Sequence, residues 1–270
     1  MTSVLRGLIG VVHVPAMPGD PGHRGGGGFA AVEAAAVADA LALAEGGVDA
    51  IIVENFGSAP FPKGVDGSRL PPQQVALLTL VVREAARRTG LPVGVNCLRN
   101  DVIAALGIAA AAGAAFVRVN VHTGAYVTDQ GLIEGEADRS LRYRAALGAP
   151  VELAADVLVK HAAPLAPVTM TDAVHDCLDR GLADAVIVSG AATGAPVDEG
   201  LLREARAAAG ARSVLLGSGL TPERIDALAP LATGAIVGTW LKVDGKLANP
   251  VDPARVRRLA QAVAGRFFGA

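Results

Sequence analysis

PVELAADVLVKHAAPL, residues 150–165, is an apolar run that leads into Asp156 and is followed closely by Lys160 and His161. A strand with one face in water alternates apolar and polar residues, whereas a strand of a parallel sheet is covered on both faces and is apolar almost throughout. Because Val151, Leu153 and Ala155 are joined by further apolar residues, the stretch predicts a buried parallel strand with ionisable groups at its carboxyl end.

The same pattern recurs along the chain, where eight apolar runs alternate with eight helix-like segments. The strand candidates are 8–14, 48–54, 92–97, 115–121, 151–156, 183–189, 213–217 and 234–238, and the helix candidates are 29–45, 72–89, 101–112, 136–147, 171–180, 198–209, 222–228 and 253–266. Candidate helix N-caps are Asp101, Thr171 and Asp198. Repeated strand–helix units force parallel strands, and eight of them close into a barrel. We therefore predict an α/β fold, a single (β/α)8 TIM barrel over residues 1–270, with an open doubly wound sheet as the alternative.

Charge, cysteine content and hydropathy argue against a nucleic-acid-binding, a membrane-bound or a secreted protein. The formal net charge is -2, from 24 Lys and Arg against 26 Asp and Glu, which gives no electrostatic basis for binding nucleic acid or an anionic membrane. Two cysteines cannot form a disulfide framework, and the amino end has no signal-peptide pattern, so we expect a cytoplasmic protein. No apolar run reaches the ~20 residues of a membrane span. A mean hydropathy of +0.42 favours a homo-oligomer that covers apolar surface.

In a barrel of this kind the active site lies at the carboxyl ends of the strands. The polar residues expected there are His13, Glu54, Asn55, Asn96, Arg99, Asn100, Asp101, Arg118, Asn120, Asp156, Lys160 and His161. We predict that Asp156 and Lys160 transfer protons and that Glu54 is a second acid or base, with Asn96, Asn120 and His161 also in the catalytic set. Lys160 could instead form a Schiff base. The alternative is a loop salt bridge between Asp156 and Lys160. His13, Arg99 and Arg118 are predicted to bind substrate.

A metal site is weakly indicated. No close-spaced pair such as HxH or HExxH is present, which argues against zinc, whereas Glu54 or Asp156 could hold Mg²⁺ through carboxylate oxygens. Cys97 has no base near it in sequence and is predicted to be a core residue rather than a nucleophile.

Three connections are long enough to carry specificity, those after the first, second and fourth strands. Residues 18–28 are Gly-rich and could form a lid or only a slack connector. Residues 55–71 are expected to form an ordered flap. Residues 123–135 are expected to be a loop that closes over a ligand, with Asp129 in the catalytic set and Gln130 binding substrate.

Two glycine-containing turns follow the last two strands. Gly217-Ser218-Gly219 comes after the seventh strand and Gly238-Thr239 after the eighth, where barrels usually bind phosphate. Glycine lets backbone N–H groups approach an anion, and a following helix would add its amino end. We predict a phosphate site at Ser218, Gly219, Gly238 and Thr239; the alternative is that these are only tight turns. Thr193-Gly194 is a further candidate for the same rim.

Several motifs together resemble the BtpA/SgcQ family, within the ribulose-phosphate-binding barrels. They are HVPAMPG at 13–19, VENFG at 53–57, NCLRND at 96–101, RVNV at 118–121, TDQG at 128–131, ADVLVKHA at 155–162 and GSGL at 217–220. Cys97 departs from the pattern, in which a plain aliphatic residue is usual. The resemblance covers nearly the whole chain and implies a TIM barrel.

The resemblance leaves two function classes open. One is an enzyme acting on a phosphorylated sugar or related phosphoester, as an aldolase or other lyase, an isomerase or a hydrolase. The other is a non-catalytic photosystem I biogenesis factor that binds a partner protein. We favour the enzyme, because an assembly factor would not need so many polar groups in one apolar-walled mouth.

Overall fold

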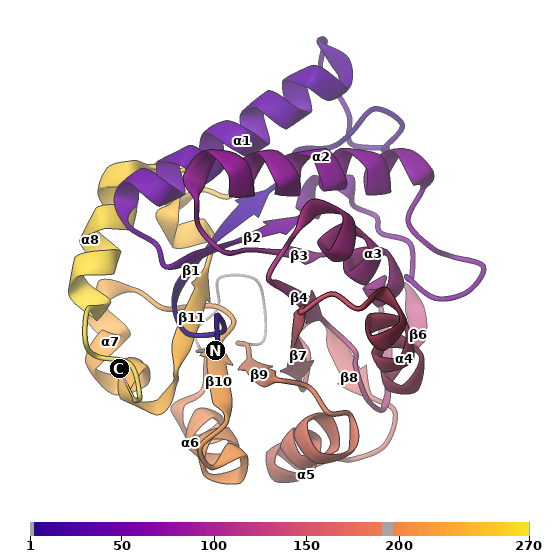
Figure 1. The fold of residues 1–270 in the computed structure, drawn as a ribbon. Helices are drawn as coiled ribbons and strands as arrows, with labels where there is room; N and C mark the ends of the chain where they lie inside the picture. Colours follow the sequence, from indigo (N-terminus) through magenta and orange to yellow (C-terminus); the bar gives the residue numbers. More distant parts are fainter. Residues whose placement is uncertain (1–2, 191–196, 270) are drawn as a thin grey trace.

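A computed structural model describes residues 3–190 and 197–269, and the candidate Thr193-Gly194 lies outside this part. Eight parallel strands form a closed barrel in the order β1-β11-β10-β9-β7-β4-β3-β2 (Figure 1). They are β1 (Gly7–His13), β2 (Ala50–Glu54), β3 (Val93–Asn96), β4 (Phe116–Val119), β7 (Glu152–Val157), β9 (Ala185–Val188), β10 (Ser213–Leu216) and β11 (Gly234–Val237). The predicted TIM barrel is confirmed, and the open sheet is wrong.

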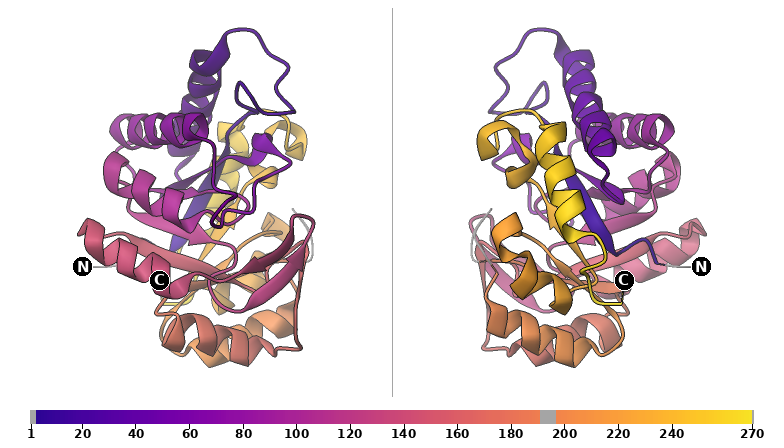
Figure 2. Two further views of the ribbon diagram at one scale, coloured as in Figure 1. Left: turned by 90° about the vertical axis from the view of Figure 1, so that its right-hand side faces the viewer. Right: turned by 90° about the vertical axis from the view of Figure 1, so that its left-hand side faces the viewer.

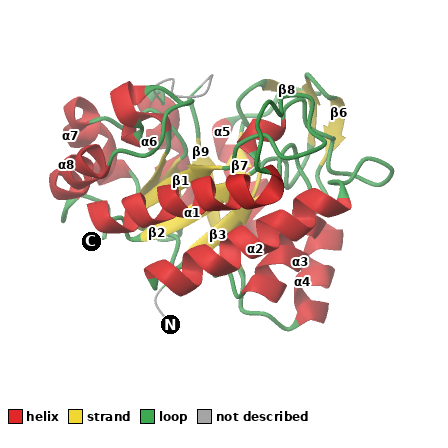
Figure 3. Cartoon of the chain, turned by 90° about the horizontal axis from the view of Figure 1, so that it is seen from above, coloured by secondary structure: helices red, strands yellow, loops and turns green. Residues whose placement is uncertain are grey.

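Helices surround the barrel on its outside (Figures 2 and 3). They are α1 (Gly28–Gly46), α2 (Pro72–Thr89), α3 (Val102–Ala112), α4 (Ala137–Leu147), α5 (Met170–His175), α6 (Glu199–Ala209), α7 (Ile225–Leu228) and α8 (Pro253–Val263). Asp101 and Asp198 cap α3 and α6 by accepting from Ala104 and Leu201 N–H. The cap predicted at Thr171 is wrong: Thr169 caps α5, because Thr169 has the extended backbone of a cap residue while Thr171 is already helical.

Two helix candidates differ in form. The predicted helix 171–180 is α5 followed by a π-helical turn at Asp176–Arg180, and the predicted helix 222–228 is a 3-10 turn at Pro222–Arg224 followed by the four-residue α7. The amino end of a helix this short adds little to an anion site, so the helix that we expected to assist phosphate binding is not there in the predicted form.

Both faces of the barrel strands are buried, which explains their apolar sequences. In β1, Leu8 and Val12 pack outward against the helices, while Ile9 and Val11 join the cluster that fills the barrel. Phe116 fills much of this interior, and a Cβ at Gly94 would lie 2.2 Å from its ring, so only glycine fits there. The barrel centre is therefore closed, and a ligand can enter only at an end.

A layer of polar and glycine residues lies directly beyond the apolar interior, at the carboxyl ends of the strands. Side chains two residues apart share a face, so the interior positions at Val11, Ile52 and Phe116 are followed by inward-facing His13, Glu54 and Arg118. The same step leads on the other strands to Asn96, Asp156, Ser189, Gly217 and Gly238. The chain thus changes from apolar to polar or glycine at the same level on all strands.

The connection at 123–135 is not the loop that we predicted. It forms the hairpin β5 (Ala125–Thr128) and β6 (Gly131–Glu134), and β5 also pairs with β8 (Ala162–Pro164), which follows directly after Lys160 and His161. Figure 3 shows β6 and β8 beyond one end of the barrel strands. Because its backbone is tied into a three-stranded sheet, this segment is a preformed wall at the carboxyl end.

The expected homo-oligomer stays a prediction. Leu132 and Val127 are cross-strand partners on the outer face of the three-stranded sheet, and they are 42% and 49% exposed. As for membranes, none of the helices in the described ranges combines the length and the apolar character that a bilayer span requires. The cytoplasmic location also stays a prediction.

Candidate active site at the barrel mouth

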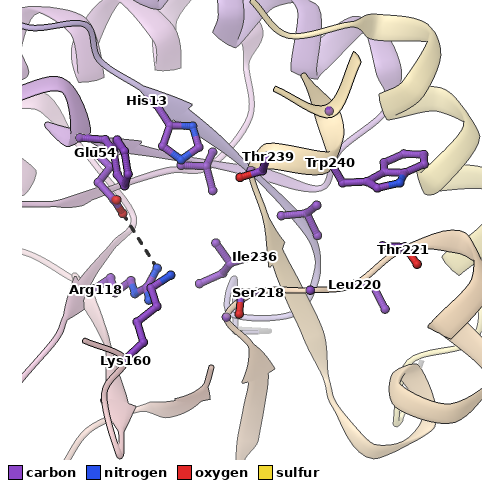
Figure 4. Close-up of a pocket in the computed structure, with 17 residues that line it drawn as sticks. His13, Glu54, Arg118, Lys160, Ser218, Leu220, Thr221, Ile236, Thr239 and Trp240 are labelled. Carbon is purple, nitrogen blue, oxygen red and sulfur yellow. Dashed lines mark ion pairs between the residues drawn. The ribbon is translucent and has the colours of Figure 1, made fainter. Parts of the chain in front are cut away.

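Two adjoining cavities open at the carboxyl end of the barrel. The first, of about 180 Å³, is bounded by His13 and by the turns that contain Ser218, Gly219, Gly238 and Thr239. The second, of about 430 Å³, is bounded by Asn96, Arg99, Asn120, Asp129, Gln130 and His161. Glu54, Phe56, Arg118 and Lys160 line both. Figure 4 shows Glu54, Arg118 and Lys160 on one side of the first cavity, with Ser218 and Thr239 across from them.

Of the residues predicted to act in catalysis or binding, Asp156 is the one that lines neither cavity. Its fully buried carboxylate accepts two hydrogen bonds from Arg118, at 3.0 and 2.9 Å from Nε and Nη2, and one from Asn120 Nδ2 at 2.7 Å. This ion pair replaces the loop salt bridge to Lys160 that we gave as the alternative. Breaking such a buried pair typically costs about 3–5 kcal/mol. Asp156 therefore lines neither cavity itself and instead orients the side chains of Arg118 and Asn120.

The side-chain amide of Asn120 is hydrogen-bonded through its nitrogen but not, within the described chain, through its oxygen. Since its Nδ2 must face the Asp156 carboxylate, its Oδ1 is fixed as an acceptor, and no partner for that oxygen lies among residues 3–190 and 197–269. A buried acceptor without a donor is costly in an isolated protein. At the edge of a cavity, it indicates a place for a hydroxyl or amine of a ligand.

Glu54 is an acid that lines both cavities of the mouth. Its Oε2 accepts from Asn96 Nδ2 at 2.9 Å and lies 3.9 Å from Arg118 Nη1. The strand register explains this arrangement, because Glu54 pairs with Asn96 and Asn96 pairs with Arg118 at the same level. The sequence placed each residue at a strand end, and the register made them neighbours.

Lys160 lies in the loop after β7 and borders both cavities. Its backbone carbonyl accepts from Arg99 Nη2 at 2.7 Å, which fixes the loop. No carboxylate in the described part of the chain lies within ion-pair distance of its ammonium. Burial lowers the pKa of Lys160 below its ordinary value, and Arg118 lowers it further, while Glu54 and Asp156 act in the opposite direction. The neutral amine is therefore more accessible here than on a surface lysine.

The glycine turns bring backbone N–H groups to the first cavity. Among the described residues, the N–H groups of Gly219, Gly238 and Thr239 donate to no backbone carbonyl. Gly219 has a φ of 70°, a conformation that favours glycine. A Cβ at Gly238 would lie 2.5 Å from the His13 ring, so this glycine makes room for the histidine. Ser218 Oγ accepts from Gly190 N–H at 3.0 Å and ties this turn to the end of β9.

Sequence reasoning missed how two further asparagines act. Asn55 donates to the Leu98 carbonyl at 3.2 Å and accepts from Leu98 N–H at 2.7 Å, and Asn100 makes the same paired bonds to the backbone of Val121. Each clamps the end of one strand to the next. Their positions at strand ends were visible in the sequence, but a clamp on a neighbouring backbone requires the barrel. Phe56, which borders both cavities, was also missed.

The predicted metal site gains no support from side-chain grouping. Within the described ranges, no three His, Cys, Asp or Glu side chains are gathered as metal ligands. Asp156 is already bonded by Arg118 and Asn120, and Glu54 faces Arg118, so Mg²⁺ at either carboxylate stays a prediction. Burial raises the pKa of the Cys97 thiol well above its ordinary value, in keeping with the predicted core role.

His13 should make stability depend on pH. Burial lowers the pKa of His13 from 6.5 to about 4, with Glu54 acting in the opposite direction. Between these values the unfolded chain binds a proton that the folded chain does not, so the free energy of unfolding should fall as the pH is lowered through this window. The loss should be on the order of 3 kcal/mol by pH 4.

Urea denaturation at pH 7 and pH 4.5 checks this expectation. The His13→Gln variant should lose less stability than wild type between the two pH values, by about 2 kcal/mol. His175→Gln, on an exposed helix position, is the matched control and should behave as wild type. An equal loss in wild type and His13→Gln would show that His13 does not carry the effect.

Comparison with known proteins confirms the family resemblance that the sequence motifs indicated. The BtpA family model matches residues 5–265. Photosystem I biogenesis protein BtpA of Synechocystis sp. (strain ATCC 27184 / PCC 6803 / Kazusa) is 48% identical over 257 residues, which cover 95% of this chain and 88% of that protein. SgcQ of Escherichia coli (strain K12), named for the sgc region, is 29% identical over 259 residues, with 96% and 94% covered.

Among solved structures, a monomeric form of phosphoribosylanthranilate isomerase from Thermotoga maritima has a TM-score of 0.56 at 12% identity, over 96% of this chain and 99% of that one. At this identity the likeness shows the barrel fold alone. The family match over nearly the whole chain and the similarity to BtpA go further: this chain belongs to the BtpA family.

Proposed function

We propose that this protein is an enzyme that acts on a phosphorylated sugar or a related phosphoester at the carboxyl mouth of the barrel. The observation that carries the proposal is that Glu54, Arg118 and Lys160 border two cavities at once. A ligand with its phosphate at the glycine turns and the rest of its chain in the second cavity would pass directly over an amine and a carboxylate.

The residues of the mouth suit carbonyl chemistry. Lys160, with a lowered pKa, can take a proton from carbon or oxygen, or its amine can attack a carbonyl carbon and form an imine as water leaves. Glu54 can supply or accept the second proton. In this proposal Asp156 is a positioning residue that holds Arg118 and Asn120 toward the ligand. Aldol cleavage, isomerisation and phosphoester hydrolysis are the reaction classes that these groups could serve.

The second candidate function is a non-catalytic role in photosystem I biogenesis. The similarity to BtpA favours it, because that relative carries the role in its name. A relative in Escherichia coli, which is not photosynthetic, counts against photosystem assembly as a role shared by the family. A biogenesis factor would also have no need of a lysine with a lowered pKa that shares a cavity with three N–H groups which, in the described chain, donate to no backbone carbonyl.

Binding of a small phosphate ester is the direct test. Calorimetric titration of wild type with glycerol 3-phosphate should show saturable binding with a dissociation constant of about 1 mM or tighter, because backbone donors form charge-assisted hydrogen bonds with the anion. Glycerol is the matched control and should give no binding. Absence of binding by both glycerol 3-phosphate and inorganic phosphate would remove the phosphate site and leave the biogenesis role as the better account.

A further inference from the structure

Arg99 is a buried cation with a fixed position in the second cavity. It is 6% exposed and follows β3. Its backbone N–H donates to the Pro62 carbonyl at 3.0 Å, and the preceding residue, Leu98, is held by the Asn55 clamp. Its Nη2 donates to the Lys160 carbonyl at 2.7 Å. The guanidinium is therefore placed by its neighbours on both sides and is not free to turn out to solvent.

Arg99 has no ion-pair partner in the part of the chain that the structure describes. No carboxylate among residues 3–190 and 197–269 lies within ion-pair distance of Arg99, and residues 191–196 contain no acidic side chain. Arg118, which is equally buried, has both Asp156 and Glu54 as partners. Asp129 borders the same cavity but is exposed and accepts from Gln130 instead. A buried cation is normally paired, so an unpaired one facing a cavity indicates an anionic ligand.

The barrel order places Arg99 opposite the glycine turns. In the sequence of strands around the barrel, β3 is four strands away from β10 in both directions. Eight strands spaced about 4.8 Å apart and tilted about 36° form a barrel about 15 Å wide. A ligand held at Gly219 and at Arg99 would cross the mouth, and its middle would lie over Glu54 and Lys160.

We propose that Arg99 binds a carboxylate of the substrate, which makes the substrate a phosphorylated acid with a short carbon chain. This inference rests on the proposed function and names its substrate class. A guanidinium forms two parallel hydrogen bonds with a carboxylate, whereas phosphate is already provided for at the glycine turns. Asn120 Oδ1, one of two buried side-chain acceptors of this cavity that have no partner in the described chain, would receive a hydroxyl of the chain between the two anions.

Two probes that differ only at the carboxyl end test the inference. 6-Phosphogluconate and glucitol 6-phosphate share a six-carbon chain and one phosphate, but only the first has a carboxylate. In calorimetric titrations, wild type should bind 6-phosphogluconate at least about ten-fold more tightly, as expected for a charge-assisted pair. Arg99→Met should reduce this ratio to about one through weaker binding of 6-phosphogluconate, with glucitol 6-phosphate and inorganic phosphate affected less than about three-fold.

Two further variants separate charge from geometry. Arg99→Lys retains a positive charge but not the planar fork, so its ratio should lie between those of wild type and Arg99→Met. Arg142→Met removes an arginine from an exposed face of α4 and should retain the wild-type ratio. This control shows whether loss of any positive charge changes the affinity for acids.

The possible failures are distinguishable. Equal binding of both probes by wild type would overturn the carboxylate site and leave the phosphate site standing. Tighter binding of glucitol 1,6-bisphosphate than of 6-phosphogluconate would replace the carboxylate with a second phosphate and also overturn the inference. If wild type bound neither the probes nor inorganic phosphate, the proposed function itself would fail, and the inference with it.

Discussion

Turnover of a phosphorylated substrate should fall by about 10³-fold or more in Lys160→Met, because the variant loses an amine that borders both cavities. Methionine has a similar length and no charge, so the loss would reflect chemistry rather than an empty space. Lys246→Met, at an exposed position, is the matched control and should retain wild-type turnover. The assay is product formation from a panel of sugar phosphates and phosphorylated acids, with folding checked by thermal unfolding.

The pH profile adds a readout that a merely structural lysine would not change. If the neutral amine is the active form, kcat/KM should rise with pH through a pKa below that of an ordinary lysine, because burial lowers the pKa of Lys160. Glu54 raises this pKa by stabilising the ammonium. Glu54→Gln should therefore move the rise to lower pH, in addition to any loss of rate.

Trapping with borohydride separates the two roles of the amine. A mass adduct on Lys160 with a keto-acid or keto-sugar phosphate would support an imine, in which the amine nitrogen bonds to the carbonyl carbon and water leaves. Intact turnover without an adduct would leave proton transfer as the role. Unchanged turnover in both Lys160→Met and Glu54→Gln would remove the proposed catalytic assignment altogether.

Gly219→Val should weaken binding of inorganic phosphate or a sugar phosphate by about 100-fold or more. A branched side chain at this turn would exclude the anion from the backbone donors, and a displacement of about 1 Å is enough for a loss of this size. Ser218→Ala should weaken binding only a few-fold, because the proposed donors are main-chain groups and the Ser218 hydroxyl accepts from Gly190 N–H. The contrast between the two variants, measured by calorimetric titration, is the test.

Backbone strain needs its own control, since Gly219 has a φ of 70°. Gly148 has a φ of 63° at the end of α4, with open space around it, so Gly148→Val imposes a similar strain far from the mouth. It should destabilise the fold without changing phosphate affinity. Equal phosphate affinities in wild type, Ser218→Ala and Gly219→Val would show that the glycines form only tight turns.

The barrel strands and most helix starts could be predicted because their signals lie in neighbouring residues of the chain. A strand covered on both faces is apolar at every position, and a helix begins at a cap such as Asp101 or Asp198, so neither signal depends on distant residues. The hairpin β5–β6 was not predicted, because its strands lack this local signal. Tyr126 and Ile133 are buried on one face, while Val127 and Leu132 are exposed on the other, so apolar residues occupy both faces and hide the alternation of a strand.

By itself, the sequence determined the barrel and the set of polar residues at its mouth, because a strand end can be located from the strand's own residues. Only the tertiary structure decided which of those residues meet. Asp156 and Arg118 lie 38 positions apart in the chain, and the pairing of β4 with β7 brings them together, so that Arg118 bonds the Asp156 carboxylate and that carboxylate lines neither cavity. The same closure of the barrel leaves Arg99 and Lys160 without carboxylate partners in the described chain, because pairing depends on how neighbouring strands are staggered, and that stagger is set by packing around the whole barrel.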